Sequence, residues 1–311
     1  MREIKYSIVV PVFNEEKTVQ TFYDTVIPIM EQQNEEFEII YINDGSRDNT
    51  ENILLQLAEK DKRVKIINFS RNFGQQAALL CGFKNALGQA VIDIDVDLQD
   101  PPEVIIKMIE KWKEGFDVVH GKRKKRKGET IFKKLSAFIY SRFIRKITNM
   151  DIPKDTGDFK LFDRKVIDTI ISLSEHNRFL RGITTWVGFK QTFVEFERKA
   201  RVEGETKYNF KSLLKLATNG IVANSNYPLT ISLKFGIFGL VVSILTFITF
   251  VILVIVDKYL PLTAYLFPTI AFFASLICVF NGLSNIYLAR IYDEVKNRPV
   301  YIEKNKINFE D

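Results

Sequence analysis

Short apolar runs alternate with amphipathic stretches over the first hundred residues of the chain. The runs are nearly continuous in Val and Ile, whereas the stretches between them carry apolar residues at helical spacing. Strands that alternate with helices form parallel βαβ units, and strands without a polar face fit a sheet that is covered on both sides. We therefore expect an α/β domain with a Rossmann-like, mostly parallel sheet. The expected strands are 7–12, 38–42, 64–69 and 90–94, and the expected helices start near 15 and cover 49–60 and 75–87.

Two later runs, 236–256 and 262–289, contain no charged residue. A helix needs roughly 20 apolar residues to cross a bilayer, and a buried core helix usually keeps one polar face, which these runs lack. The five residues 257–261 between the runs allow only a helical hairpin. We therefore expect transmembrane helices at 231–256 and 262–289.

Basic residues flank the expected hairpin on the side away from its short loop. Bacterial and eukaryotic membrane proteins keep such residues in the cytoplasm, so both termini and the α/β domain are expected there, in a multi-pass protein of the cell membrane. The domain is expected at 1–208, a juxtamembrane amphipathic helix at 209–230 and a cytoplasmic tail at 290–311. The flanking basic residues are Lys211, Lys215, Lys234, Arg290, Lys296 and Arg298.

A basic amphipathic helix is expected at 131–147. Its apolar residues recur at helical spacing and Lys and Arg fill much of the remainder, a pattern typical of helices that lie on a membrane surface. Packing of the same helix on the domain is an equal alternative.

Composition narrows the function classes. The net charge of +6, from 44 basic and 38 acidic residues, fits an anionic lipid surface at least as well as nucleic acid, and we expect no nucleic-acid partner. Cys81 and Cys278 lie far apart and predict no disulfide. Only His120 and His176 are present, which excludes a histidine-rich zinc site, and the chain lacks the Gly-x-x-x-x-Gly-Lys-Ser/Thr motif of P-loop NTPases.

Polar residues follow all four expected strands. They begin at Asn14, Asn43, Ser70 and Asp95, where each apolar run ends. In open α/β sheets, ligands bind beyond the carboxyl ends of the strands. The four polar clusters therefore predict a single site.

Asp95 and Asp97 are the sharpest candidates for chemistry in that site. Two carboxylates that alternate at a strand end suit a hard divalent cation, Mg²⁺ or Mn²⁺, and Gln99 could add a neutral oxygen ligand. A cation there would neutralise charge that grows on a diphosphate leaving group. The alternative is that these residues are solvated acids of a turn before a helix that begins with Pro.

Asp44 and Asp48 flank the segment Gly45-Ser46-Arg47 after the second expected strand. Gly45 allows a sharp turn, so that Asp44 can accept hydrogen bonds from a nucleobase or ribose. Asp48 is the better candidate for capping the helix that follows.

Taken together, the motifs resemble those of family 2 glycosyltransferases with the GT-A fold. They are most similar to polyisoprenyl-phosphate glycosyltransferases, namely dolichyl-phosphate mannose synthase and its bacterial relatives that act on undecaprenyl phosphate. The resemblance covers essentially the whole chain, including the C-terminal hairpin of the bacterial branch. The motifs are residues 11–15, 43–48, 70–74 and 95–102.

The resemblance implies roles for individual residues. Nucleotide-sugar binding falls on Pro11, Asn14, Glu15, Asp44, Ser70, Asn72, Asp95 and Asp97, and the metal ligands are Asp95, Asp97 and Gln99. The catalytic residues are Asp97, Asp158, Arg123 and Arg126, with Asp158 near the reacting centre. Lys160 stands where the family often has Arg, which weakens any role for that position.

The chemistry of a lipid phosphate supports this interpretation. Its second pKa is about 6, so it is largely a dianion at neutral pH and needs cations to hold it rather than a strong base. We therefore expect Asp158 to orient groups or contact the sugar and not to remove a proton. The candidate cations are Arg123, Arg126, Arg198, Arg201 and Lys207.

The expected activity is inverting transfer of glucose or N-acetylglucosamine from a UDP-sugar to undecaprenyl phosphate at the cytoplasmic membrane face. The expected partners are the UDP-sugar, the lipid phosphate and the bilayer, and small residues at Gly236, Gly239 and Ser243 suggest a face for homo-oligomers. The alternatives are a mannosyltransferase that uses GDP-mannose, or a flippase component. A flippase is disfavoured because neither apolar run, 236–256 or 262–289, holds a charged residue, and a processive polysaccharide synthase because no Gln-x-x-Arg-Trp motif is present.

Overall fold

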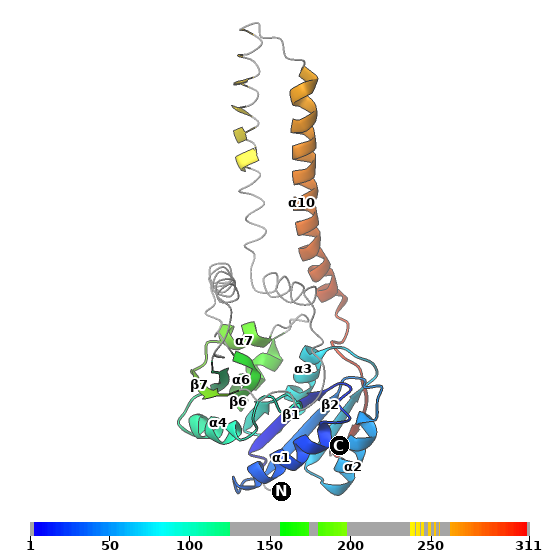
Figure 1. Ribbon diagram of the computed structural model, residues 1–311, viewed down its shortest axis with the longest axis vertical. Helices are drawn as coiled ribbons and strands as arrows, with labels where there is room; N and C mark the ends of the chain where they lie inside the picture. The colour runs from blue at the N-terminus through cyan, green and yellow to red at the C-terminus, as the bar shows by residue number, and fades with distance from the viewer. Residues whose placement is uncertain are drawn as a thin grey trace. The chain divides into compact units, whose positions relative to one another are not determined.

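The computed structural model describes residues 3–124, 156–173, 180–197, scattered positions between 237 and 255, and 262–309. The chain divides into two compact units (Figure 1). The first combines Met1–Phe210 with Pro299–Asp311, and the second is Lys211–Arg298. The expected helices at 131–147 and 209–230 lie outside the described residues, as does most of 231–256.

One eight-stranded sheet forms the centre of the described part of the first unit, in the order β7-β5-β6-β4-β1-β2-β3-β8. Strands β4, β1, β2 and β3 are mutually parallel, β5 is parallel to β7, and β6 and β8 run antiparallel to their neighbours. The predicted mixed α/β architecture is confirmed, and the four predicted strands are present. The strands are β1 (Tyr6–Val12), β2 (Phe37–Asn43), β3 (Val64–Phe69), β4 (Ala90–Asp93), β5 (Val118–Arg123), β6 (Thr156–Asp163), β7 (Gln191–Phe196) and β8 (Glu303–Ile307).

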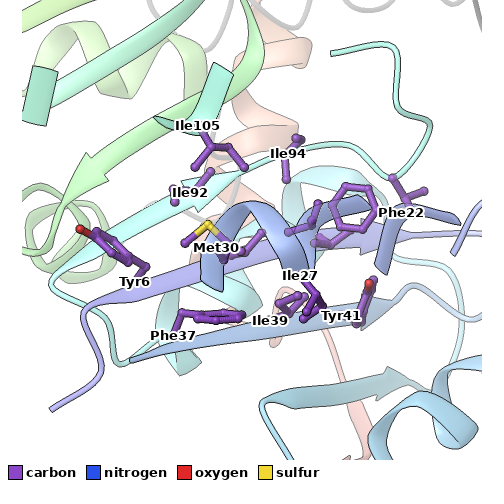
Figure 2. Close-up of a cluster of buried hydrophobic side chains, with 14 of the residues drawn as sticks. Tyr6, Phe22, Ile27, Met30, Phe37, Ile39, Tyr41, Ile92, Ile94 and Ile105 are labelled. Carbon is purple, nitrogen blue, oxygen red and sulfur yellow. The ribbon is translucent and has the colours of Figure 1, made fainter. Parts of the chain in front are cut away.

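Helices cover both faces of the sheet, and alternate residues of the strands β1 to β6 belong to two different cores. Ile8 and Val10 of β1 face a cluster with the helices α1, α2 and α4, whereas Val9 faces a second cluster with α3, α6 and α7. Figure 2 shows the first cluster, where Phe22 and Met30 of α1 lie over the sheet. The helices are α1 (Val19–Glu31), α2 (Thr50–Lys60), α3 (Gln75–Asn85), α4 (Val104–Lys113), α6 (Arg164–Ser172) and α7 (Leu180–Trp186).

The second unit contains the helix α10 (Leu262–Lys296), which is 35 residues long and continues past the expected end at 289. Large apolar side chains along it are exposed, among them Leu266, Phe272 and Leu288. Within the described stretches of the chain, no helix meets both the length and the hydropathy needed to cross a bilayer. The two spans expected from the sequence therefore stay predictions.

Strand β8 is the main difference from the expected architecture. The sequence predicts a simple tail at 290–311, but Glu303–Ile307 pairs antiparallel with β3 and becomes an edge of the sheet. Its sequence, Glu-Lys-Asn-Lys-Ile, is polar because four of its five side chains are exposed. No apolar alternation therefore marks it as a strand.

Candidate active site

The loops after β1 and β2 are joined by hydrogen bonds of both backbone and side chain. The N–H of Asn14 donates to Ser46 Oγ at 3.0 Å, and the N–H of Arg47 donates to Asn14 Oδ1 at 2.8 Å. Asn14 has a positive φ of 55°, which an Asn side chain tolerates better than most. The N–H of Glu15 donates to Thr50 Oγ1 at 2.9 Å. The predicted residues Asn14 and Glu15 thus lie against the loop that carries Asp44, next to the half-buried Pro11 of β1.

Asp48 stabilises the start of α2, as its predicted capping role requires. Its Oδ1 accepts hydrogen bonds from the N–H of Thr50 at 3.1 Å and from the Thr50 hydroxyl at 2.6 Å. The residue in the N-cap position is Asn49, whose side chain makes no capping bond. Asp48 therefore acts from one position earlier than a standard cap.

Asp44 holds the loop after β3. It is only 4% exposed, and its carboxylate accepts from the N–H of Phe73 at 2.6 Å and of Gly74 at 2.9 Å. Burial raises the pKa of this carboxyl, and the two N–H donors and Arg71 oppose that rise. A carboxylate offers about four acceptor positions, so the two bonds leave capacity for a ligand.

The loop after β3 passes directly over Gly45. A Cβ at that position would lie 2.6 Å from the backbone carbonyl carbon of Arg71, and its φ is +70°. Both facts require glycine. The predicted residues Ser70 and Asn72 are exposed on this loop, and Asn72 Nδ2 donates to the Asp44 carbonyl at 3.2 Å.

Acidic side chains from β6 and from the segment after β4 converge on Asp95. Burial raises the pKa of Asp95 to about 7, with further increases from the charges of Asp158, Asp97 and Asp100, while Arg123 lowers it. Gln75 Nε2 donates to Asp95 Oδ1 at 2.9 Å. The structure thus brings together Asp95, Asp97, Asp158 and Arg123, which the sequence had placed on one site from segments far apart in the chain.

Arg123 is held at the edge of this acidic cluster. Its Nη2 lies 3.3 Å from Asp100 Oδ2, and a Cβ at Gly157 would approach the same nitrogen to 2.8 Å. The Nε atom is buried and makes no hydrogen bond within the described part of the chain. Gly157 therefore makes room for the guanidinium, which keeps donors for an anionic ligand.

The acidic cluster fits a divalent cation that is shared with a ligand. Among the described residues, no three His, Cys, Asp or Glu side chains are close enough to hold a metal ion by themselves. Mg²⁺ is commonly bound by one or two carboxylates together with substrate phosphates and water. Asp95 and Asp97 meet that requirement, since the like charges that raise the pKa of Asp95 are those that a cation would neutralise. Gln99, the third predicted ligand, is 8% exposed. Its N–H donates to Asp97 Oδ1 at 3.1 Å, which fixes the turn between Asp97 and Gln99.

Sequence reasoning missed a row of buried polar residues beneath the site. Asp93 of β4 is paired in register with Lys160 of β6, and Lys160 with His120 of β5; each is at most 3% exposed. Burial and the Lys160 charge lower the pKa of His120 to about 4, and its Nε2 lies 2.8 Å from Gln191 Oε1. The available signal was a titratable residue beside apolar neighbours: Asp93 between Ile92 and Ile94, Lys160 between Phe159 and Leu161, and His120 after Val119.

The remaining predicted cations cannot be placed. Arg126, Arg198, Arg201 and Lys207 lie outside the described residues. At the end of β5, Lys122 pairs with Glu195 at 3.3 Å, and Lys124, which follows the strand, pairs with Glu197 at 3.9 Å.

Comparison with known proteins finds a family model, curated relatives and solved structures that are similar to this chain. The family model described as glycosyl transferase family 2 matches residues 7–171. An uncharacterized glycosyltransferase, YkcC, of Bacillus subtilis is 46% identical over 310 residues, which cover 99% of this chain and 96% of that protein. The bactoprenol glucosyl transferase of Shigella phage SfII is 42% identical over 303 residues, covering 97% of this chain and 98% of that protein. A solved structure of glucosyl-3-phosphoglycerate synthase from Mycobacterium tuberculosis is similar at a TM-score of 0.49 and 16% identity, over 70% of this chain and 78% of that one. That last similarity is too remote to transfer a ligand or a residue's role.

Proposed function

Because this chain belongs to glycosyl transferase family 2, we propose that it transfers a sugar from a UDP-sugar to a polyisoprenyl phosphate. The observation that carries this proposal is the convergence of Asp97, Asp100 and Asp158 on Asp95, with Arg123 beside them. A diphosphate needs a cation held by carboxylates, and a second phosphate needs a guanidinium. The site around Asp95 supplies both the carboxylates and the guanidinium.

The proposed acceptor is undecaprenyl phosphate and the first candidate sugar is glucose. Both come from relatives whose names describe bactoprenol glucosyl transferases and which align with 97% of this chain at 40–42% identity. Their similarity extends well past residue 171, where the family model ends, and so includes Arg198, Arg201 and Lys207, which are among the candidate cations for the lipid phosphate. N-acetylglucosamine is the second candidate.

The proposed donor site lies at the carboxyl ends of β1 to β4. The interlocked loops that contain Asn14, Asp44 and Asn72 would line the nucleotide, because their backbone groups and carboxylates face the edge at which α/β folds bind ligands. Asp95 and Asp97 would hold Mg²⁺ or Mn²⁺ against the diphosphate, and the cation would neutralise the charge that develops on the departing UDP.

The proposed transfer step needs no proton acceptor. An oxygen of the lipid phosphate dianion attacks the anomeric carbon of the sugar, and the bond from that carbon to the diphosphate oxygen breaks with its electron pair leaving on UDP. Attack from the face opposite UDP inverts the configuration. Arg123 would hold the attacking phosphate, and Asp158 would position the sugar or the guanidinium.

We also propose that residues 231–256 and 262–289 anchor the enzyme in the cell membrane. The proposal is supported by the absence of charged residues from 236–256 and 262–289 and by the basic residues that flank them. A polyisoprenyl acceptor is itself confined to the bilayer, so an anchored enzyme would meet it without leaving the membrane surface. The basic segment at 131–147 would contact lipid headgroups.

Transfer of radiolabelled sugar from a panel of UDP- and GDP-sugars to undecaprenyl phosphate tests the proposal, with purified full-length protein in detergent, with and without Mn²⁺. We expect metal-dependent labelling of the lipid from UDP-glucose and loss of labelling in Asp97→Ala. Asp24→Ala is the matched control, since Asp24 is an exposed acid on α1 whose carboxylate accepts only from Gln20 at 3.0 Å among the contacts of the described chain. Labelling that is unaffected by Asp97→Ala would refute the assigned site.

A further inference from the structure

We propose that strand β8 is a working part of the nucleotide-sugar site and positions it through a chain of side-chain amides on Asn305, Asn68 and Asn43. The inference rests on the proposed function, because it assumes that the loops after β1, β2 and β3 bind the nucleotide. It assigns a role in donor binding to the C-terminal residues, which lie far from every sequence motif of the site.

The three asparagines form a row across three neighbouring strands. Asn43 of β2 is paired in register with Asn68 of β3, and Asn68 with Asn305 of β8. Asn43 Nδ2 donates to Asn68 Oδ1 at 2.8 Å, and Asn68 Nδ2 donates to Asn305 Oδ1 at 2.8 Å. Asn43 and Asn68 are each only 1% exposed. A buried amide depends on such partners, and Asn305, itself exposed at the sheet edge, supplies the acceptor for the Asn68 amide.

The row ends at the loop that carries Asp44. Asn43 Oδ1 accepts from the N–H of Ser46 at 3.0 Å, and Ser46 Oγ in turn accepts from the N–H of Asn14 at 3.0 Å. The side-chain amides donate in one direction, from β2 towards β8, which allows each bond to polarise the next. The position of Asn305 is thereby coupled to two loops of the donor site.

A second connection runs from the start of β8 to the loop after β3. The N–H of Ser70 donates to the carbonyl of Ile302 at 3.0 Å. The ring of Tyr301 stacks on Phe69 at 5.0 Å between centroids, and Phe69 meets the ring of Phe73 edge-on at 5.8 Å. Phe73 is the residue whose N–H binds the Asp44 carboxylate. The first connection therefore reaches the loop that carries Asp44, and the second reaches the Asp44 carboxylate.

The exposed side chains of β8 indicate that its contribution is not mainly to the core. Glu303, Lys304, Asn305 and Lys306 are all exposed, and Lys304 forms an ion pair near the surface with Glu51 at 3.1 Å. Surface ion pairs contribute little to stability. The Asn305 amide is distinguished from its neighbours by its bond to a buried partner in the row.

Asn305→Ala in the full-length enzyme tests the inference, with UDP binding and the KM values for UDP-glucose and undecaprenyl phosphate as readouts. We expect the Kd for UDP and the KM for UDP-glucose to rise about tenfold, as follows from loss of one bond to a buried group, with the lipid KM unchanged. Asn305→Asp keeps an acceptor oxygen and should restore most of the affinity. Lys304→Ala is the matched control and should bind UDP like the unaltered enzyme.

Two results separate failure of the inference from failure of the proposed function. If the unaltered enzyme binds UDP and Asn305→Ala binds it equally well, or if both substrates' KM values rise together, β8 does not position the donor site. If the unaltered enzyme binds GDP-sugars but not UDP, or binds no nucleotide at all, the assigned donor is wrong and the inference falls with it.

Discussion

Asp158 sits among like charges, and the proposed chemistry assigns it no proton to remove. It is one of the carboxylates that raise the pKa of Asp95, and it follows Gly157, which makes room for Arg123. A general base contributes about 10²–10⁴-fold to a rate. We predict that Asp158→Asn lowers kcat by less than about tenfold at saturating substrates, because the acceptor is already a dianion near neutral pH.

The measurement is steady-state transfer over pH 6–9 for Asp158→Asn and the unaltered enzyme. A loss of several orders of magnitude, together with loss of the rise in rate on the acid side of the pH profile, would show that Asp158 abstracts a proton after all.

His120 provides a pH dependence of stability whose sign follows from its burial. Its pKa falls from 6.5 to about 4 in the folded protein, because burial and the neighbouring Lys160 disfavour the charged ring. The neutral His120 ring makes its full contribution to the free energy of unfolding above pH 6.5. That contribution is lost as the pH falls towards 4. We predict a loss on the order of 2 kcal/mol by pH 5.

Thermal unfolding of the unaltered protein and of His120→Gln between pH 7.5 and 5 measures this effect. Gln has no titrating group, so the variant should lose less stability than the unaltered protein over this interval. Parallel curves would mean that His120 is already charged, or freely solvated, in the folded state.

At the residue scale, the sequence marks candidate site residues where polar groups end an apolar run. Asp95 and Asp97 stand out because they end an apolar run, and the structure gathers Asp158 and Arg123 around them. Asp44 was expected to contact the nucleotide, yet both of its oxygens accept N–H groups of the next loop. That use could not be predicted, because it depends on how close two loops approach in space.

At the scale of elements, Gly45 allows the loops after β2 and β3 to approach each other closely. We predict that Gly45→Ala weakens donor binding by at least tenfold, because its Cβ would lie 2.6 Å from the Arg71 backbone and push the second loop away from Asp44. The KM for UDP-glucose measures the effect.

The variant Gly115→Ala is a control that separates the effect of this steric clash from the effect of backbone strain at a positive φ. Gly115 has a positive φ of 89°, as Gly45 has, but nothing lies within 4 Å of the Cβ that would be added. Both variants should lose some thermal stability, whereas only Gly45→Ala should lose donor affinity. Equal donor KM values in the two variants would contradict the close contact between the loops.

The predictability of an element followed its burial. Strands β1 to β4 are buried on both faces and therefore show as runs of Val and Ile, which is why their ranges were predicted closely. Strand β8 lies at the sheet edge with exposed side chains and contributes mainly backbone pairing and polar contacts. Hydropathy reports burial and not pairing, so an exposed edge strand from the end of the chain leaves no pattern to detect.

For the whole molecule, the expected hairpin predicts a topology. Lys258 lies in the loop between the two expected spans and should face the outside of the cell, whereas Lys304 on β8 should face the cytoplasm with the first unit. A membrane-impermeant maleimide applied to intact cells tests this topology. The two variants are Lys258→Cys and Lys304→Cys, each made in a background without Cys81 and Cys278.

We expect labelling of Lys258→Cys in intact cells, and of Lys304→Cys only after the membrane is opened. Lys304 is a suitable position because its side chain is exposed and outside the row of asparagines. Labelling of both variants, or of neither, in intact cells would rule out a hairpin that crosses the membrane.

The central claim is that this enzyme joins a sugar to a lipid phosphate through the site around Asp95. The most direct measurement is mass spectrometry of the lipid formed from UDP-glucose by the purified enzyme, with undecaprenyl phosphate and undecaprenol offered together. The account predicts glucosyl undecaprenyl monophosphate in the β configuration, free UDP in equal amount, no glucosyl undecaprenol, and no product from Asp97→Ala. Glucosylated undecaprenol, or UDP released without any glycolipid, would contradict it.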